Sequence, residues 1–448
     1  MHSSALIHAE RAVPRYTSYP TAPHFDACVG APEHRRWMEG LPSDAALSLY
    51  LHVPFCTAIC GYCGCTTKAT RRASPVEAYA ERLEREIDRV ADALPGRRVI
   101  HLAWGGGTPS MLGPRWLERL HRRIAQRFDL GALGEHAIEL DPRETDVATV
   151  AALATIGITR ASLGVQDFSA HVQTAIGRVQ PFGTVERAVD LLRAAGIDAI
   201  NIDLMYGLPH QTERDVRRTV ALAHVLAPSR LALFGYAHVP WIRPNQRTID
   251  ERALPGPEER LAQAEAAAEK LEVLGYRAIG LDHFARPSDP LAVAAAEGTL
   301  KRNFQGYTTD QADALIGLGA SAISRLPQGF TQNAPDAGSY KRAIDSGHFA
   351  TTRGVAFTAD DLVRGRLIEA LMCNLSVDIG ELRRADAGAS GYALLLEEMA
   401  GLARSGLVNI QGSRIAMTRE GRPFVRLAAA ALDARRQAAS HARHSIAV

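Results

Sequence analysis

Cysteine, aromatic side chains and net charge are all scarce in this sequence. Only six cysteines occur among 448 residues, a usage typical of a reduced, intracellular protein rather than of a disulfide-stabilised secreted one. Aromatic residues make up 6% of the chain, too few for a protein that binds nucleic acid by stacking bases on rings. The 51 basic and 49 acidic residues nearly cancel, so no polyanionic partner is indicated.

Long apolar runs are also missing. No window reaches about 18 uninterrupted apolar residues, so no membrane-spanning helix is expected. Residues 1–11 mix charges into what would be the apolar part of a signal peptide. The remaining composition, with 46% hydrophobic and 22% charged residues, is that of a globular protein of about two or three domains. We expect a cytoplasmic monomer without a nucleic-acid or membrane partner.

Four of the six cysteines lie close together, and this stretch is the most informative part of the chain. Cys56, Cys60 and Cys63 have the spacing Cys-x3-Cys-x2-Cys, and Cys65 follows. Three thiolates on one short loop can bind three irons of a cubic 4Fe–4S cluster and leave the fourth iron open to a small molecule. Because Cys65 would close that open corner, we expect it not to be a ligand.

Two other roles for these cysteines stay open. A structural zinc site usually takes two well-separated Cys-x2–4-Cys pairs, whereas all four thiols here share one loop. Disulfides would require an oxidising compartment, which the low cysteine count argues against. The spacing therefore favours an iron–sulfur cluster over both.

From residue 46 to about residue 330 the chain alternates short apolar runs with amphipathic segments, which predicts strands separated by helices in a domain of residues 46–355. The first run, residues 46–53, leads into the cysteine loop, and a capping box of Ser74 and Glu77 predicts that a helix follows. Repeated strand–helix units form a parallel sheet, and about six units are too few for a closed barrel. We therefore predict an α/β fold with a partial (β/α)6, TIM-like barrel. Further strands are expected at residues 99–104, 137–140, 160–163, 199–205, 231–234 and 277–279, and helices at 184–195 and 213–226.

Residues 356–448 are predicted to form a small, mostly helical, winged-helix-like domain. Thr358 is the expected N-cap of its first helix, and residues 392–402 are expected to be helical. Residues 407–417 are typical of a hairpin turned at Gly412, and another helix is expected near Gly421. Such a shape often binds DNA, but these helices are not notably basic, so DNA binding is not expected.

Residues suited to chemistry fall at or just after the predicted strand ends. The run Gly105-Gly106-Gly107-Thr108-Pro109 follows a strand and lets a ligand approach the backbone closely. Glu139, Gln166 and Asp203 follow or end other strands. Because the carboxyl ends of parallel strands meet at one edge of a sheet, we expect these residues to lie beside the cysteine loop.

The cysteine and glycine motifs together resemble those of radical S-adenosylmethionine (SAM) enzymes, whose open iron holds the amino and carboxylate groups of SAM. Longer runs narrow the resemblance to the oxygen-independent coproporphyrinogen III oxidase family. The similarity extends over roughly residues 14–430 and is looser near its end. It rests on residues 15–20, 60–65, 104–109, 139–143, 164–168, 201–209, 282–287 and 302–307.

The resemblance implies an enzyme that converts two propionate side chains of coproporphyrinogen III to vinyl groups, with release of carbon dioxide. It implies a 4Fe–4S cluster on Cys56, Cys60 and Cys63, two SAM molecules, and an electron-donor protein such as a flavodoxin or a ferredoxin. The SAM-binding positions that carry over are Tyr50, Tyr62, Gly106, Gly107, Thr108, Glu139, Gln166, Arg178, Asp203, Ala237, Phe304, Gln305 and Ile323, and among them Tyr50, Glu139 and Gln305 are expected to act in catalysis.

Two alternatives from the same superfamily stay open. A haem-binding chaperone shares the cluster and glycine motifs, but typically lacks Cys65 and the motif at residues 15–20, both present here. Another radical enzyme, such as a methyltransferase, would not need the run at residues 303–307. Within the site, Arg178 and Asp203 would bind the charges and hydroxyls of SAM, or would instead pair with each other across the barrel mouth.

Residues 1–45 are expected to form an ordered arm that lies on the main domain. Tyr16, Tyr19 and Phe25 are unusual in disordered segments. The barrel could bury its core without this arm, while Arg15 and Tyr16 are suited to contact carboxylates. We therefore expect the arm to handle a substrate with four propionates rather than to support folding.

Overall fold

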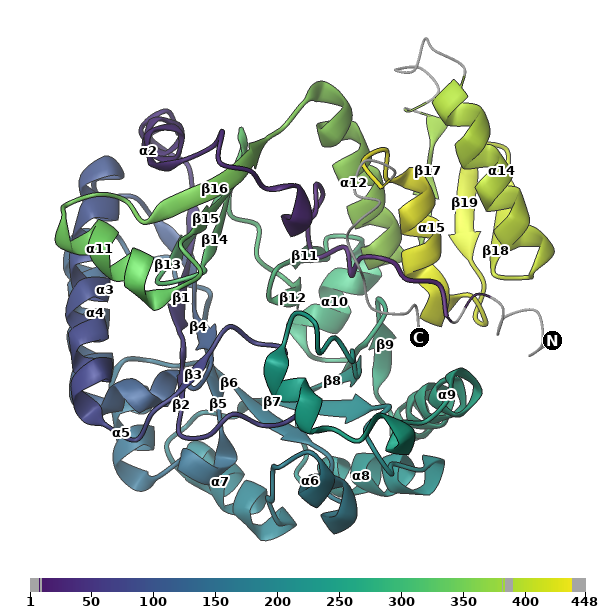
Figure 1. Ribbon diagram of the computed structural model, residues 1–448, viewed down its shortest axis with the longest axis horizontal. Coiled ribbons are helices and arrows are strands. Elements are labelled where there is room, and N and C mark those ends of the chain that lie inside the picture. Colours follow the sequence, from purple (N-terminus) through teal and green to yellow (C-terminus); the bar gives the residue numbers. More distant parts are fainter. Residues whose placement is uncertain (1–7, 9, 381, 383–389, 437–448) are drawn as a thin grey trace.

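A computed structural model describes residues 8, 10–380, 382 and 390–436. Its centre is a curved, twelve-stranded sheet with helices on the outside of the curve (Figure 1). The strand order is β16-β15-β14-β13-β1-β4-β5-β6-β7-β8-β10-β9. In this described part of the chain, no helix has both the length and the apolar character needed to cross a membrane.

Six consecutive parallel strands form the middle of the sheet, which confirms the predicted partial barrel. Helices connect them, and the strands' apolar side chains share one buried core with all of these helices except α6. The strands are β1 (Leu47–Val53), β4 (Val99–Gly106), β5 (Glu135–Leu140), β6 (Arg160–Gln166), β7 (Ala199–Tyr206) and β8 (Arg230–Gly235). The helices are α3 (Ala73–Ala93), α4 (Gly113–Arg127), α5 (Val147–Thr155), α6 (Ala170–Ala175), α7 (Phe182–Ala194), α8 (Glu213–Val225) and α9 (Pro257–Val273).

Successive side chains of β1 point alternately into the core beneath the helices and into the barrel interior. Leu47, Leu49 and Leu51 are fully buried in the core shared with the helices. The intervening residues point to the opposite face of the sheet, because successive strand side chains alternate. Tyr50 and His52 therefore lie on the inner side of the barrel, where the tyrosine hydroxyl lies 3.1 Å from His52 Nδ1.

The two edges of the sheet differ from the sequence-based expectation. Residues 277–279 do form a strand, β9 (Arg277–Ile279), but it pairs antiparallel with β10 (His283–Ala285), so its place in the parallel series was wrongly predicted. The segment between β9 and β10 is too short for the crossover that a parallel pair needs. At the other edge lie four strands that the sequence pattern did not reveal: β13 (Ala314–Leu318), parallel to β1, then β14 (Ile323–Leu326), β15 (Gly329–Asn333) and β16 (Thr351–Ala356).

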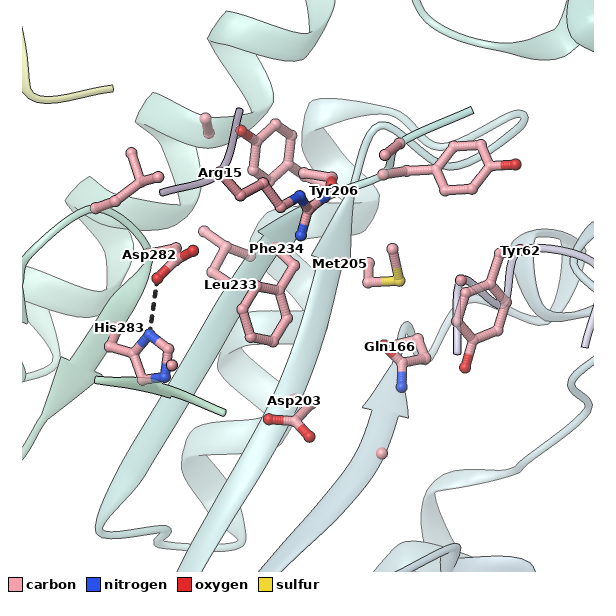
Figure 2. Close-up of a pocket in the computed structure, with 18 of the residues that line it drawn as sticks. Arg15, Tyr62, Gln166, Asp203, Met205, Tyr206, Leu233, Phe234, Asp282 and His283 are labelled. Carbon is pink, nitrogen blue, oxygen red and sulfur yellow. Dashed lines mark hydrogen bonds and ion pairs between the residues drawn. The ribbon is translucent and has the colours of Figure 1, made fainter. Parts of the chain in front are cut away.

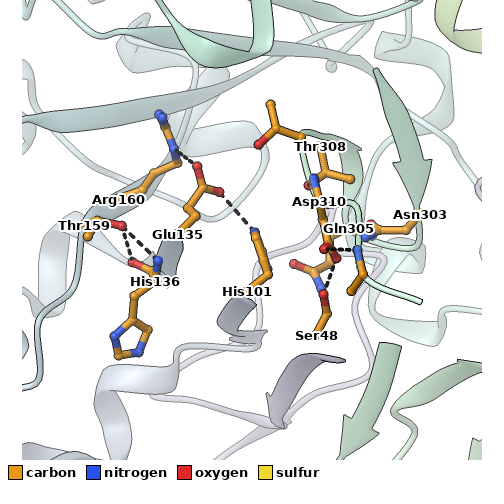
Figure 3. Close-up of polar contacts among 12 residues, drawn as sticks. Ser48, His101, Glu135, His136, Thr159, Arg160, Asn303, Gln305, Thr308 and Asp310 are labelled. Atoms are coloured by element: carbon orange, nitrogen blue, oxygen red, sulfur yellow. Dashed lines mark hydrogen bonds and ion pairs between the residues drawn. The ribbon is translucent and has the colours of Figure 1, made fainter. Parts of the chain in front are cut away.

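Polar side chains fill the barrel interior near the strand beginnings (Figure 3). Glu135 accepts hydrogen bonds from Arg160 Nε at 2.9 Å and, at 3.3 Å, contacts His101 Nε2. Ser48 donates to Asp310 on the other side of the same view. Buried charges need such partners, so this end of the barrel is closed by paired groups.

Helix beginnings show one wrong and one confirmed capping prediction. Ser74 does not cap α3, because the helix already begins at Ala73 and Arg72 occupies the N-cap position without a side-chain hydrogen bond. Thr358 does cap α12 (Ala359–Asn374), and it forms a reciprocal capping box with Asp361.

Helices packed on a small sheet form the C-terminal region. The hairpin of β18 (Val408–Gln411) and β19 (Arg414–Met417) turns at Gly412, whose φ is 60°, as predicted. A third strand, β17 (Ser376–Asp378), pairs antiparallel with β19 and was not predicted. The helices are α12, α14 (Ser390–Arg404) and α15 (Val425–Leu432), the last preceded by a short 3-10 turn at Arg422–Phe424.

The described part of the N-terminal arm, residues 8 and 10–45, is ordered, as predicted, but it contributes to two cores. Phe25 stacks on Phe330 of β15 at 5.8 Å, and Met38 of α2 (Ala31–Glu39) is buried in the barrel core. Tyr16 and Tyr19 instead pack into the core of the C-terminal helices, so the arm does not simply lie on the barrel (Figure 1). The boundaries at residues 45 and 355 stay predictions.

The remaining elements are short. They are β2 (Phe55–Cys56), β3 (Lys68–Ala69), α10 (Pro290–Glu297), β11 (Lys301–Asn303), β12 (Gly306–Thr308) and α11 (Ala337–Asp345).

Candidate functional site

A pocket of about 1360 Å³ opens at the carboxyl ends of the parallel strands, where the sequence predicts the site. Side chains from the ends of neighbouring strands, among them Gln166 and Asp203, project into it beside Tyr62 of the cysteine loop (Figure 2). Fourteen of the sixteen predicted site residues line it: Cys56, Cys60, Cys63, Tyr62, Gly106, Gly107, Thr108, Glu139, Gln166, Arg178, Asp203, Ala237, Phe304 and Gln305.

The other two predicted residues, Tyr50 and Ile323, line a smaller cavity of about 150 Å³. Phe304 and Gln305 line both spaces, so they stand between the two. The backbone N–H of Gln305 donates to Asn303 Oδ1 at 2.8 Å, which fixes the turn that carries this residue (Figure 3). The predicted residues thus form two adjoining groups.

Each of the three predicted ligand sulfurs receives its own hydrogen-bond donors. Cys56 Sγ accepts from Thr67 Oγ1 at 3.4 Å and from Thr108 Oγ1 at 3.5 Å. The backbone N–H of Cys65 donates to Cys63 Sγ at 3.4 Å. Such donors stabilise thiolate over thiol, and thiolate is the form that ligates metal.

The third sulfur, Cys60 Sγ, lies beside two guanidinium groups. Arg178 Nη1 is 3.6 Å away and Arg143 Nη2 is 3.9 Å away. Among the described residues, no three His, Cys, Asp or Glu side chains are grouped closely enough to bind a single metal ion. Three separately stabilised thiols on one loop at the pocket wall fit the three corners of a larger, four-iron cluster.

Two neighbouring amide side chains hold the cysteine loop from outside, and no motif in the sequence had pointed to them. Asn245 Nδ2 donates to the carbonyl oxygens of Cys60, Gly61 and Cys63 at 3.1, 3.3 and 2.9 Å. Gln246 Nε2 donates to the carbonyl oxygen of Tyr62 at 2.9 Å. The segment Pro244–Thr248 therefore fixes the backbone of the loop.

We expect Asn245→Leu to weaken cluster retention, because the side chain keeps its volume but loses the amide group that donates to all three carbonyl oxygens. Unmade hydrogen bonds of this kind cost about 1–3 kcal/mol, so iron loss to a chelator should quicken by roughly ten- to a hundredfold. The measurement is the rate of loss of the visible absorbance after anaerobic reconstitution. Asn409→Leu, at an exposed position of strand β18, is the matched control and should behave like wild type. Equal rates for both variants would refute this role.

The triple-glycine run packs against Glu139 and Tyr50 at distances that exclude any side chain. A Cβ on Gly105 would lie 2.7 Å from Glu139 Oε1 and 2.9 Å from the Tyr50 hydroxyl. One on Gly107 would lie 2.4 Å from the carbonyl oxygen of Phe55. The N–H of Gly106 donates to Glu139 Oε2 at 3.0 Å. The run is therefore glycine because the backbone approaches these groups closely.

Burial raises the pKa of Glu139 to about 7, although the hydrogen bond from Gly106 opposes this shift and the nearby Asp203 adds to it. At neutral pH this carboxyl is therefore near its titration midpoint in the ligand-free pocket. A cationic ligand group beside it would favour the ionised form.

This shift predicts how the stability of the ligand-free protein varies with pH. Between pH 4.5 and 7 the folded state holds a proton on Glu139 that the unfolded state has lost, so stability falls as pH rises through this window. The contribution amounts to about 3 kcal/mol. Denaturant titrations at pH 5, 6, 7 and 8 should show this decline in wild type and less of it in Glu139→Gln. The same pH dependence in both proteins would contradict the assignment.

Arg178 and Asp203 do not pair with each other, so that alternative is wrong. Arg178 Nη1 pairs with Asp141 at 3.0 Å, and its Nε is buried without a hydrogen-bond partner in the described structure. Asp203 accepts hydrogen bonds from Ser162 at 3.0 Å and from Asn201 at 2.9 Å. Each group is thus held separately with capacity left for a ligand.

Gln166 occupies a strained position at the end of β6. Its φ is 70°, a left-handed value that a residue other than glycine rarely adopts, and the register with β7 shifts between Gly164 and Gln166. Such strain is often found at binding sites because it redirects a side chain. Here it accompanies a side chain that lines the pocket (Figure 2).

Comparison with known proteins identifies the family. Residues 50–223 match the model of the radical SAM superfamily. The chain is 47% identical to the oxygen-independent coproporphyrinogen III oxidase of Paracoccus denitrificans over 97% of its own length and 96% of the relative's, and 39% identical to that of Escherichia coli over 92% and 91%. The solved structure of coproporphyrinogen III oxidase from Escherichia coli, described as a radical SAM enzyme, superimposes with a TM-score of 0.88 at 37% identity and covers 95% of this chain and 100% of that one. This chain therefore belongs to the oxygen-independent coproporphyrinogen III oxidase family of radical SAM enzymes.

Proposed function

We propose that this protein converts two propionate side chains of coproporphyrinogen III to vinyl groups without oxygen, giving protoporphyrinogen IX. Each propionate loses carbon dioxide, one hydrogen atom from its β-carbon and one electron, which passes to an acceptor. When bound, a reduced 4Fe–4S cluster and SAM supply the 5′-deoxyadenosyl radical that takes this hydrogen atom. The observation that carries the proposal is the meeting of the family's cysteine loop, glycine run and acidic strand ends in one pocket.

The residues around the cysteines are suited to hold the cluster and one SAM molecule. Cys56, Cys60 and Cys63 would ligate the cluster. The unpartnered Nε of Arg178 can donate to the SAM carboxylate. Ionised Glu139 can accept from its ammonium group, and Asp203 from ribose hydroxyls.

The second group of predicted residues supports a second SAM position. Tyr50, Phe304, Gln305 and Ile323 surround the smaller cavity, which adjoins the large pocket through Phe304 and Gln305. Because this cavity holds only about 150 Å³, the second SAM would extend into the shared space. Tyr50, Glu139 and Gln305 would then act close to the reacting propionate and exclude water from it.

The remaining expectations concern partners and location. The cluster needs one electron at a time, which supports a flavodoxin or a ferredoxin as the donor. All six cysteines are free thiols in the structure, which supports a reducing compartment such as the cytoplasm. We propose a monomer that needs no nucleic-acid or membrane partner.

Anaerobic turnover tests the proposed function directly. Reconstituted protein with SAM, a reductant, an electron acceptor and coproporphyrinogen III should release two carbon dioxide molecules per protoporphyrinogen formed. Tight binding of haem without any decarboxylation would instead favour the haem-chaperone alternative.

A further inference from the structure

Five arginine side chains line the side of the pocket that lies away from the cysteine loop. They come from distant parts of the chain: Arg15 from the arm, Arg260 from α9, Arg302 from β11, and Arg422 and Arg426 from the C-terminal region. Figure 2 shows Arg15 and Asp282 toward one side of the pocket and Tyr62, the neighbour of Cys63, toward the other. We refer to these five residues as the arginine cluster.

Three members of the arginine cluster, Arg15, Arg302 and Arg422, share the nearby carboxylate of Asp282, which carries one negative charge against their three positive charges. Asp282 Oδ1 lies 4.0 Å from Arg302 Nη1 and accepts a hydrogen bond from His283 Nδ1 at 2.8 Å. Two acidic residues nearer the rim have other partners, Glu272 in Arg419 at 3.0 Å and Glu269 in Arg217 at 3.1 Å. Side chains of the cluster also donate to backbone carbonyls, which carry no full charge: Arg15 to Gly235, Arg260 to Tyr236, Arg422 to Gly280 and Arg426 to Val13.

Burial makes this excess charge costly unless an anion joins it. Arg426 is 6% exposed, and its pKa is lowered to about 10, first by burial and next by the charge of Arg15. In the described structure, Arg302 Nη1 and Arg422 Nη2 are buried with no hydrogen-bond partner. Buried donors on charged groups are normally bonded, so these two are suited to receive a ligand oxygen.

The wall between the arginine cluster and the cysteine loop is apolar. Met205, Leu233 and Phe234 line the pocket there (Figure 2). The pocket therefore fits a ligand with a broad apolar body and several carboxylates, because flat rings pack on such side chains while guanidinium groups bind carboxylates through paired donors.

We propose that the arginine cluster binds the propionate carboxylates that do not react, and so directs a reacting propionate toward the cysteine loop. This inference rests on the proposed function, which supplies a macrocycle with four propionates. Two of these remain in the product, so they offer the enzyme lasting points of attachment while the other two are converted. Arg15 and Arg422 are the first residues to substitute, because they belong to segments outside the barrel and still line the pocket.

Binding of coproporphyrin III, a stable and fluorescent tetracarboxylate, tests this inference on reconstituted holoenzyme with SAM. We expect Arg15→Gln and Arg422→Gln each to weaken binding by about ten- to a hundredfold and to raise the KM for coproporphyrinogen III similarly. SAM affinity and cluster absorbance should stay within about twofold of wild type. Arg15→Lys should recover part of the loss. Wild type should bind the tetramethyl ester, which has no carboxylates, far more weakly than the acid.

Arg419→Gln is the matched control, since this rim arginine is 77% exposed and paired with Glu272. The inference is overturned if both cluster variants bind coproporphyrin III like wild type, if the control weakens binding equally, or if the ester binds as tightly as the acid. The ester comparison uses wild type alone, so it decides the matter even where a variant does not fold. Wild type that prefers the acid but never decarboxylates coproporphyrinogen III would refute the proposed function and leave the arginine cluster as a carboxylate site.

Discussion

Replacing Cys56, Cys60 or Cys63 by serine should abolish the cluster and with it all turnover. Each thiol has its own hydrogen-bond donors, so one thiol cannot replace another. Thr67 and Thr108 donate to Cys56. Two arginine guanidinium groups donate to Cys60, and the Cys65 N–H donates to Cys63. Iron and sulfide content after anaerobic reconstitution, with the visible absorbance, should fall below about a tenth of wild type. Loss of a ligand removes one corner of the cluster outright.

Cys65→Ser separates this assignment from a four-cysteine site. The backbone N–H of Cys65 donates to Cys63 Sγ, and the Cys65 side chain also hydrogen-bonds to Cys63; serine keeps the N–H and offers a hydroxyl donor, so iron content should stay near wild type. Cys373→Ser, at a buried thiol in α12, controls for general loss of stability. If Cys65→Ser lost iron as fully as Cys60→Ser, all four thiols would be ligands and the open corner would not exist.

The barrel and the place of its site could be predicted because both follow from local patterns. Each strand–helix unit has its own apolar periodicity, and parallel strands bring their carboxyl ends to one edge whatever their exact pairing. Glu139 and Asp203 were therefore expected beside the cysteines before any pairing was known, and they line the same pocket. The hairpin at Gly412 could be predicted for the same reason, because its two strands are adjacent in the sequence.

What the sequence could not show depends on contacts between distant segments. Strand β13 lies beside β1 in the sheet, for instance Leu47 beside Ala314, although the rest of the barrel lies between them in the sequence, and no local pattern encodes such a pairing. The arginine cluster is likewise assembled from several segments, so none of its members stands out in the sequence. Asn245 was missed for the same reason: an amide that bonds three carbonyls of a distant loop resembles any other loop residue.

For the N-terminal arm, the prediction of order was correct, but the function inferred for one of its residues was wrong. Its order was expected from its aromatic residues, yet the expectation that it serves the substrate and not the fold fails for Tyr16. That side chain is 3% exposed, and its hydroxyl donates to the carboxylate of Asp433 at 3.0 Å within the protein, not to a group in the pocket. Arg15, one residue earlier, lines the pocket. Arg15 thus faces the pocket, while the adjacent Tyr16 stabilises the fold.

Removing residues 1–24 should therefore destabilise the C-terminal region as well as abolish turnover. The truncation takes Val13, Tyr16 and Tyr19 out of the core that they share with α12 and α15. Losing a buried aromatic side chain costs about 3–5 kcal/mol, and removing the Tyr16 hydroxyl leaves the 7% exposed Asp433 without that donor. Calorimetry should show an early transition that wild type lacks, and Tyr16→Ala should reproduce most of it.

Arg11→Ala, at an exposed position of the same arm, is the control and should melt like wild type. A truncated protein that keeps the wild-type melting curve and loses only turnover would show instead that the arm acts purely on the substrate.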